Sequence, residues 1–155
     1  MTIRRALDSD RPLLLDLWER SVRVTHTFLS ESDIATLKPL VATALTSDAL
    51  EWWVAATDDD EPMAFLGYSP ATIDALFVDP RYRGRGVGTR LVAHAQQLAG
   101  GALRVDVNEQ NEAARGFYAS LGFETVGRSP TDDGGRPFPI IHMARPAPLE
   151  GASHR

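Results

Sequence analysis

Three closely spaced glycines, Gly84, Gly86 and Gly88, constrain this chain most, because they join an extended apolar run to a helical pattern. The run that ends at Val78 reads as a strand, and the apolar residues after the glycines recur at helical spacing. These residues are Val87, Leu91, Ala95 and Leu98. Glycine lets a backbone approach a ligand closely, and the free N–H groups at a helix start attract anions. The sequence therefore predicts a strand, an anion-binding turn and a helix.

The rest of the chain alternates short β-branched runs with helical patterns, which is typical of an α/β (α+β) protein with a mixed sheet. We expect strands near residues 3–6, 52–56, 63–68, 73–78, 103–107, 123–127 and 139–143. We expect one helix with Asp10 as its N-terminal cap, and further helices from Ser32 to Leu45, from 86 to 98 and from 111 to 121. Pro39 should kink or split the second helix. The acidic run 57–62 reads as a solvated hairpin turn rather than a metal site.

Length and composition limit the function. With 155 residues the chain fits one domain, expected over 1–145, and a flexible tail over 146–155. A net charge of -5 disfavours nucleic-acid and membrane partners, which bind basic surfaces. The absence of cysteine excludes disulfides, thiolate metal sites and a cysteine nucleophile. We expect no metal, and a cytoplasmic location, because the N-terminus carries no apolar leader.

Two other phosphate-binding motifs compete for the glycine turn. A P-loop requires a lysine that this turn does not contain. A dinucleotide fingerprint fits Gly84, Gly86 and the distant acid Asp106, but Thr89 occupies the place of its third glycine. The segment Asp79–Arg83 also separates the strand from the first glycine. The P-loop is rejected, and the dinucleotide site remains the weaker alternative.

Two blocks of sequence resemble the signatures of GNAT N-acetyltransferases. The first is Arg83-x-x-Gly86-x-Gly88 after Leu76–Pro80, and the second is Asn108–Asn111 followed by Gly116–Phe123. The resemblance extends from Ile3 to about Arg145, and two further pieces are similar to a bacterial subgroup of the family. These pieces are Ser21–Leu29 and Gly127–Ser129. The resemblance implies a mostly antiparallel twisted sheet of six to seven strands with about four helices, splayed where the strands ending at Val78 and Val107 part.

The same resemblance implies acetyl-CoA as the cofactor and coenzyme A as the product. The backbones of Phe77 and Val78 would bind the pantetheine arm, and Asn111 would lie beside the coenzyme. The residues expected to wrap the pyrophosphate are Arg83, Gly84, Arg85, Gly86, Val87, Gly88 and Thr89. The family's general-acid position falls on Tyr118, which lies seven residues after Asn111 on one helix face.

Acyl transfer from a thioester expels a thiolate with a pKa of about 8.5, and a phenol with a pKa near 10 can donate to that sulfur. Tyr118 can therefore act as the acid, although its helix pattern also suits a core tyrosine, and Asn111 also suits an N-cap. For the base that takes the amine proton we expect Asp74, acting directly or through water. Its rivals are His26, Asp106, Glu109 and His142. The Val78 N–H would hold the oxyanion.

The acceptor pocket is expected between segments 21–30 and 129–138, with His26 and Phe28 as substrate residues. Asp132, Asp133 and Arg136 add polar groups to the second segment. The predicted reaction is acetyl transfer to a primary amine, of a small molecule or a protein, by direct attack in a ternary complex. The alternative is a non-catalytic acyl-CoA-binding regulatory module of the same fold. A monomer and a homodimer both remain possible.

Overall fold

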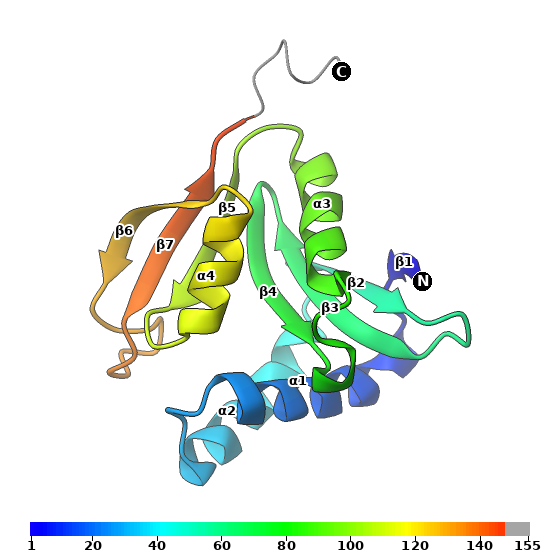
Figure 1. Cartoon of the computed structure of the whole chain (residues 1–155). Coiled ribbons are helices and arrows are strands. Elements are labelled where there is room, and N and C mark those ends of the chain that lie inside the picture. Colours follow the sequence, from blue (N-terminus) through cyan, green and yellow to red (C-terminus); the bar gives the residue numbers. More distant parts are fainter. Residues whose placement is uncertain (148–155) are drawn as a thin grey trace. The chain divides into compact units, whose positions relative to one another are not determined.

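A computed structural model describes residues 1–147 of the chain, so the expected tail beyond residue 147 lies outside the described residues. The elements appear in Figure 1. The strands are β1 (Thr2–Arg5), β2 (Glu51–Ala56), β3 (Pro62–Ser69), β4 (Thr72–Val78), β5 (Leu103–Asn108), β6 (Glu124–Ser129) and β7 (Ile140–Arg145). The α-helices are α1 (Arg11–Thr25), α2 (Glu31–Ala44), α3 (Val87–Ala99) and α4 (Glu112–Ser120). Two 3-10 helices, η1 (Asp8–Asp10) and η2 (Pro80–Tyr82), precede α1 and the glycine turn.

The strands form one seven-stranded sheet in the order β1-β2-β3-β4-β5-β7-β6. Its β1–β2, β2–β3, β5–β7 and β6–β7 pairs are antiparallel. The β4–β5 pair is parallel, and its register joins Thr72 to Arg104 and Ile73 to Val105. The α/β (α+β) fold with a mixed, mostly antiparallel sheet and four α-helices is therefore confirmed. The expected central splay stays a prediction.

The chain divides into two compact units, and the candidate site residues are distributed over both of them. One unit contains Met1–Ser69 and Asp74–Val92, and the other contains Pro70–Ile73 and the chain from Ala93 onward. The glycine turn and the start of α3 belong to the first unit, whereas Asn111 and Tyr118 belong to the second. The expectation of a single acetyltransferase domain over 1–145 stays a prediction.

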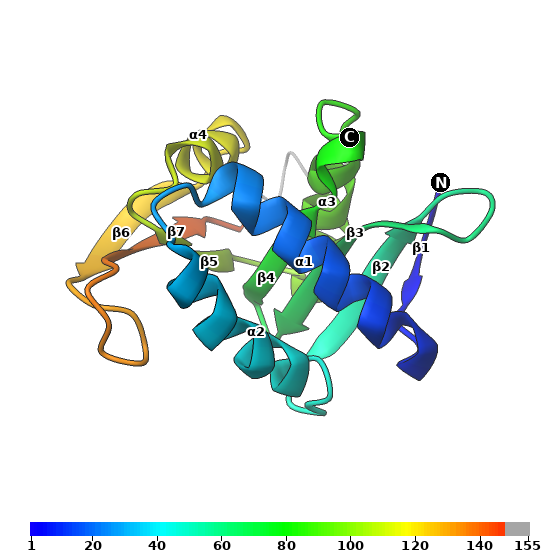
Figure 2. The same cartoon turned by 90° about the horizontal axis from the view of Figure 1, so that it is seen from below.

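In the first unit, α1 and α2 pack on one face of the antiparallel strands (Figure 2). The apolar stripe of α1 is buried because its residues recur at helical spacing. The core residues are Leu14, Leu17, Trp18, Val22, Ile34, Leu45, Val54, Ala56 and Phe65. Gly67 of β3 is required by packing, since a Cβ there would lie 2.6 Å from the ring of Trp52. This core supports β4, whose Phe77 side chain packs against it.

In the second unit, α4 lies beside the strands β5, β7 and β6 (Figure 1). Alternation along β5 buries Leu103, Val105 and Val107 on one face and exposes Arg104 and Asp106 on the other. On β7 the side chains of Ile141 and Met143 are buried. Arg145 lies on the same face of this strand and donates to the Leu121 carbonyl just after α4, at 3.1 Å. The opposite face of these strands therefore carries the polar residues Asp106 and His142.

Two helix expectations need correction. Asp10 precedes α1, but its carboxylate makes no cap bond to that helix. It accepts instead from Arg4 at 2.8 Å and from the Leu7 N–H at 2.7 Å. Pro39 does not split α2, which runs unbroken through it from a capping box formed by Ser30 and Asp33. A well-capped start and a packed face therefore outweigh one missing backbone donor.

The acidic run between β2 and β3 forms a hairpin turn, as expected. Its backbone is closed by Thr57, whose N–H donates to the Glu61 carbonyl at 2.9 Å. Its carboxylates bind separate cations: Asp58 binds the N-terminal amine, Asp60 binds Arg4 and Glu61 binds Arg81. These carboxylates fasten the turn to neighbouring elements instead of converging on one point.

Candidate active site

The glycine turn connects η2 to α3 and is shaped by two residues with left-handed backbone. Gly84 has φ 78° and Gly86 has φ 77°, a region that side chains rarely adopt. A Cβ built on either residue would meet nothing within 4 Å, so conformation and not crowding requires glycine. The Arg90 N–H donates to the Gly86 carbonyl at 3.1 Å, which makes Gly86 the start of the α3 hydrogen-bond ladder. The N–H groups of the residues just after Gly86 have no hydrogen-bond partner within the helix. The backbone before them has free space beside it at the Cβ positions of Gly84 and Gly86. A pyrophosphate fits such a surface.

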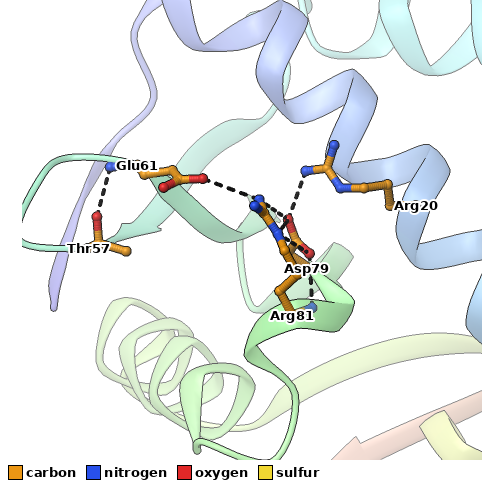
Figure 3. A network of polar contacts seen from close by, with 5 residues as sticks. All are labelled: Arg20, Thr57, Glu61, Asp79 and Arg81. Atoms are coloured by element: carbon orange, nitrogen blue, oxygen red, sulfur yellow. Dashed lines mark hydrogen bonds and ion pairs between the residues drawn. The ribbon is translucent and has the colours of Figure 1, made fainter.

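Asp79 fixes the entry to this turn. It is a fully buried carboxylate, and it caps η2 by accepting from the Arg81 N–H at 3.0 Å. The Arg20 guanidinium of α1 donates to it at 2.7 Å, and the Arg81 guanidinium donates at 2.9 Å (Figure 3). The Asp79 N–H donates to the Met63 carbonyl of β3 at 2.8 Å. One side chain thus ties the end of β4 to α1 and β3, all within the first unit.

The electrostatics of Asp79 keep it charged. Burial alone would raise the pKa of its carboxyl, but hydrogen bonds from Arg81 and Arg20 lower that pKa to about 2. Arg81 also binds Glu61 at 3.2 Å, and the Glu61 N–H donates to the Thr57 hydroxyl at 3.1 Å (Figure 3). The network therefore extends from α1 through η2 to the β2–β3 hairpin. Sequence reasoning missed this role, although an acid directly before Pro80 is a recognisable cap signal.

The arginines of the turn are arranged around Tyr82. The guanidinium carbons of Arg81 and Arg85 each lie 5.6 Å from the centre of its ring. Such cation–π contacts hold a guanidinium without removing its charge. Arg83 and Arg85 are both exposed. The turn therefore presents positive charge beside its open backbone, as the sequence predicts.

The expected substrate residues His26 and Phe28 lie with Phe77 in one aromatic cluster. The His26 ring centre is 5.4 Å from that of Phe28 and 6.5 Å from that of Phe77. The Thr25 hydroxyl donates to the Ser21 carbonyl at 2.9 Å and lies 2.9 Å from the His26 Nδ1. Since the hydroxyl has one proton, His26 donates its Nδ1–H to Thr25. Desolvation lowers the pKa of His26 to about 4, so the ring is neutral.

The expected base Asp74 lies on β4, three residues before Phe77. Its carboxylate accepts from the Ser69 hydroxyl at 2.5 Å, and its side chain is exposed. Alternation along the strand places Asp74 and Phe77 on opposite faces. The first unit therefore contains the turn, Val78 and Asp74 as well as the cluster of His26, Phe28 and Phe77.

The second unit contains Asn111 and Tyr118 on α4. Asn111 caps the helix by accepting from the Ala114 N–H at 3.0 Å, which confirms its expected N-cap role. Tyr118 is buried, and its ring meets Phe117 at 5.0 Å and Phe123 at 5.3 Å between centres. Desolvation raises the pKa of the Tyr118 phenol above its ordinary value of 10.0, so it stays protonated. A neutral phenol is a hydrogen-bond donor and not a base.

The rival base residues of the second unit divide into two groups. Glu109 binds Arg128 at 2.6 Å, and that contact lowers the pKa of Glu109. Asp106 lies 2.6 Å from the Nδ1 of His142, and the Nε2 of His142 lies 2.7 Å from the Ser129 hydroxyl. The sequence indicates Asp106 and His142 as separate candidates, but it does not indicate that Ser129 joins them.

The expected acceptor segment 129–138 is closed by its own polar residues. Asp132 accepts from the Gly134 N–H at 3.0 Å and from the Arg136 N–H at 2.8 Å. The Arg136 guanidinium binds the same carboxylate at 2.7 Å. Two of the polar groups expected to face a substrate therefore hold the shape of their own loop.

The sequence over residues 13–123 matches the acetyltransferase (GNAT) family. The chain belongs to this family. It is 45% identical over 146 residues to the peptidyl-lysine N-acetyltransferase YjaB of Salmonella typhimurium, covering 94% of this chain and 99% of that protein. The Escherichia coli YjaB is 44% identical over 144 residues, covering 93% and 96%. The solution structure of apo-form YjaB from Escherichia coli superposes with a TM-score of 0.86 at 42% identity, covering 92% and 95%.

These relatives assign the chain a class of activity. It is an N-acetyltransferase that transfers an acetyl group to an amine, and the alternative of a non-catalytic module of the same fold is not favoured. Within residues 1–147, no helix is both long and apolar enough to span a bilayer. The family match and the two YjaB relatives confirm the resemblance to bacterial acetyltransferases.

Proposed function

We propose that this protein transfers the acetyl group of acetyl-CoA to the ε-amine of lysine side chains in other proteins. The observation that carries the proposal is the turn at Gly84 and Gly86, where left-handed backbone opens into the start of α3. The acceptor class is inferred from two relatives that are named peptidyl-lysine N-acetyltransferases and match nearly the whole chain. The reaction is direct attack in a ternary complex, and we assign it to a bacterial cytoplasm. We propose no nucleic-acid partner and no membrane partner. The protein would act as a monomer or a homodimer.

The first unit would hold the coenzyme. The turn from Arg83 to Thr89 offers backbone N–H groups and two exposed arginines to the pyrophosphate. The buried Asp79 accepts from the Arg81 N–H and so fixes η2, which leads into this turn. The backbone of Phe77 and Val78 would accept the pantetheine arm as a short additional strand. The Val78 N–H would stabilise the oxyanion of the tetrahedral intermediate.

The acid step is assigned to Tyr118. When the carbon–sulfur bond breaks, the electron pair moves to sulfur, and the phenol donates its proton or a hydrogen bond to the thiolate. The raised pKa of Tyr118 keeps that proton available at neutral pH. Asn111 would orient the same helix beside the coenzyme, since its side-chain oxygen already caps α4.

The acceptor side is assigned to the aromatic cluster. The neutral ring of His26 would line the acceptor side together with Phe28 and Phe77. Phe28 would pack against the methylene stem of the acceptor lysine. Asp74, the base expected from the sequence, can take the amine proton directly or through water.

The proposal is tested by measuring thiol release from acetyl-CoA with a panel of amines, including a lysine-containing peptide and its arginine-substituted twin. Lys38 is the sole lysine of the chain, so Lys38→Arg makes the enzyme free of lysine. Acetyl-lysine found by mass spectrometry then comes only from the acceptor. Saturable release with the lysine peptide and none with its twin is expected. Thiol release with small amines alone would mean that the acceptor is a small molecule and not a lysine of a protein.

A further inference from the structure

Asp106, His142 and Ser129 form a continuous hydrogen-bonded chain across three strands of the second unit. Asp106 on β5 lies opposite His142 on β7 in the strand register, and its Oδ1 is 2.6 Å from the His142 Nδ1. The Nε2 on the other side of the ring is 2.7 Å from the Ser129 hydroxyl of β6. The order β5-β7-β6 therefore brings together an acid, an imidazole and a hydroxyl that are far apart in the sequence.

The local backbone makes room for this arrangement. The β6–β7 register shifts between Thr125 and Gly127, so that Gly127 lies opposite His142. A Cβ at Gly127 would come within 3.4 Å of the His142 ring, closer than most real Cβ contacts. The bulge and the glycine together let the ring lie against β6 and reach Ser129.

The partners fix the tautomer of His142. A carboxylate only accepts hydrogen bonds, so the Nδ1 that faces Asp106 carries a proton. In the neutral ring the Nε2 then has a lone pair, and the Ser129 hydroxyl donates to it. The side chain of His142 is 35% exposed and that of Asp106 is 62% exposed, so solvent and ligands reach this chain.

We propose that Ser129 and His142 remove the proton from the attacking amine, and that Asp106 positions the imidazole. In this step the amine proton moves to the Ser129 oxygen, and the original hydroxyl proton moves to the His142 Nε2. The amine nitrogen then attacks the thioester carbonyl with its freed electron pair. Asp106 stabilises the imidazolium, which later releases its proton to water. This inference rests on the proposed function and names the relay, in place of Asp74, as the base.

Other charged groups on the neighbouring strands do not interrupt the relay. On β5, Arg104 lies opposite Ala144, two positions away from the pair of Asp106 and His142. On β6, Glu124 also lies opposite Ala144, and Arg128 is held by Glu109 at 2.6 Å. Ser129 begins the segment 129–138, so the relay lies at the edge of the expected acceptor wall.

The test compares His142→Gln, Asp74→Asn and the control Glu124→Gln in acetylation of the lysine peptide at pH 7 and at pH 10. A lysine amine has a pKa of about 10.4, so at pH 10 a large share needs no base. We expect His142→Gln to lower kcat/KM about 100-fold at pH 7 and less than about tenfold at pH 10. Glu124→Gln should stay within about twofold. A loss in Asp74→Asn as large as that expected for His142→Gln, with the same recovery at pH 10, would name Asp74 as the base and overturn the relay. Ser129→Ala should show the same pH recovery as His142→Gln with a smaller loss.

Two kinetic outcomes overturn the relay while the wild-type enzyme is active: an unchanged rate for His142→Gln at pH 7, or an equal loss at both pH values. Peptide mass spectrometry that finds an acetyl group on Ser129 also overturns it, because Ser129 would then be a nucleophile. Nitrogen-15 NMR of His142 gives a readout independent of activity. The Nδ1–H tautomer is expected in the wild type and its loss in Asp106→Asn, whereas an Nε2–H tautomer contradicts the inference. A wild type that acetylates no amine contradicts the proposed function instead.

Discussion

At the scale of single residues, buried charge and buried hydroxyl define what this protein can do. Asp79 has no exposed surface and faces two arginines, so its negative charge is used to hold structure. Tyr118 has a raised pKa and aromatic neighbours, so its proton is retained. The arginines therefore keep Asp79 ionised in spite of its burial, whereas burial keeps Tyr118 neutral.

Asp79→Asn should destabilise the protein by about 2 kcal/mol at pH 7, because the ionised carboxylate has a lower pKa when folded than when unfolded. The sign follows from that depression. The stabilisation is complete above the unfolded pKa of about 4 and is lost as pH falls through the folded pKa of about 2. Urea unfolding at pH 7 and pH 2.5 measures the difference between wild type and variant. The exposed Asp59→Asn serves as the control, and an equal gap at both pH values would contradict an ionised Asp79.

Tyr118→Phe should lower kcat about 100-fold and leave the Kd for acetyl-CoA within about twofold. The phenyl ring keeps the packing against Phe117 and Phe123, so the melting temperature should change little. Single-turnover thiol release and calorimetric titration with acetyl-CoA separate the two quantities. A variant that binds acetyl-CoA and keeps the wild-type kcat would remove Tyr118 from the chemistry.

At the scale of elements, sequence patterns predict most helices and strands, because apolar periodicity and glycine positions act locally. The pattern of Val87, Leu91 and Ala95 correctly predicts α3, and the type of Asn111 correctly predicts the cap of α4. The pattern fails where a tertiary partner takes a side chain. Asp10 serves Arg4 and not its helix, and α2 continues through Pro39 because its cap and core contacts support it.

Gly86→Glu should weaken acetyl-CoA binding more than about tenfold, because it adds strain, bulk and negative charge where the pyrophosphate is proposed to bind. Gly100→Glu is a matched control. Gly100 also has a positive φ, 68°, and open space around its Cβ position, but it follows the other end of α3. Both variants should lose similar stability in thermal unfolding. Equal acetyl-CoA affinity in the two variants would show that the pyrophosphate does not bind at the turn.

At the scale of the whole molecule, long-range pairing determines what local patterns cannot. The strand order places β7 between β5 and β6, and this order joins His142 to Asp106 and Ser129. Neither the spacing of these three residues nor their types predicts that their side chains are hydrogen-bonded to one another, since this arrangement also needs the bulge before Gly127. The glycine turn between β4 and α3 could be predicted because all its parts are contiguous in sequence.

The single lysine is also a property of the whole molecule. Lys38 of α2 binds Glu19 of α1 at 2.6 Å, and arginine can keep that ion pair. Lys38→Arg should therefore leave both kcat/KM and the melting temperature unchanged within error. Intact mass after incubation with acetyl-CoA and no acceptor should show no acetyl-lysine. A loss of activity in this variant would indicate that Lys38 itself participates in catalysis.

Acetylation of protein lysine is tested most directly by acetyl transfer from the lysine-free Lys38→Arg enzyme to a lysine-containing protein acceptor, followed by mass spectrometry and thiol release. We expect the release of free coenzyme A to saturate with acetyl-CoA and to match the acetyl-lysine formed on the acceptor, mole for mole. The proposed function is contradicted if acetyl-CoA does not bind while NAD binds at micromolar concentration, or if acetyl-CoA binds and no amine in the panel is acetylated.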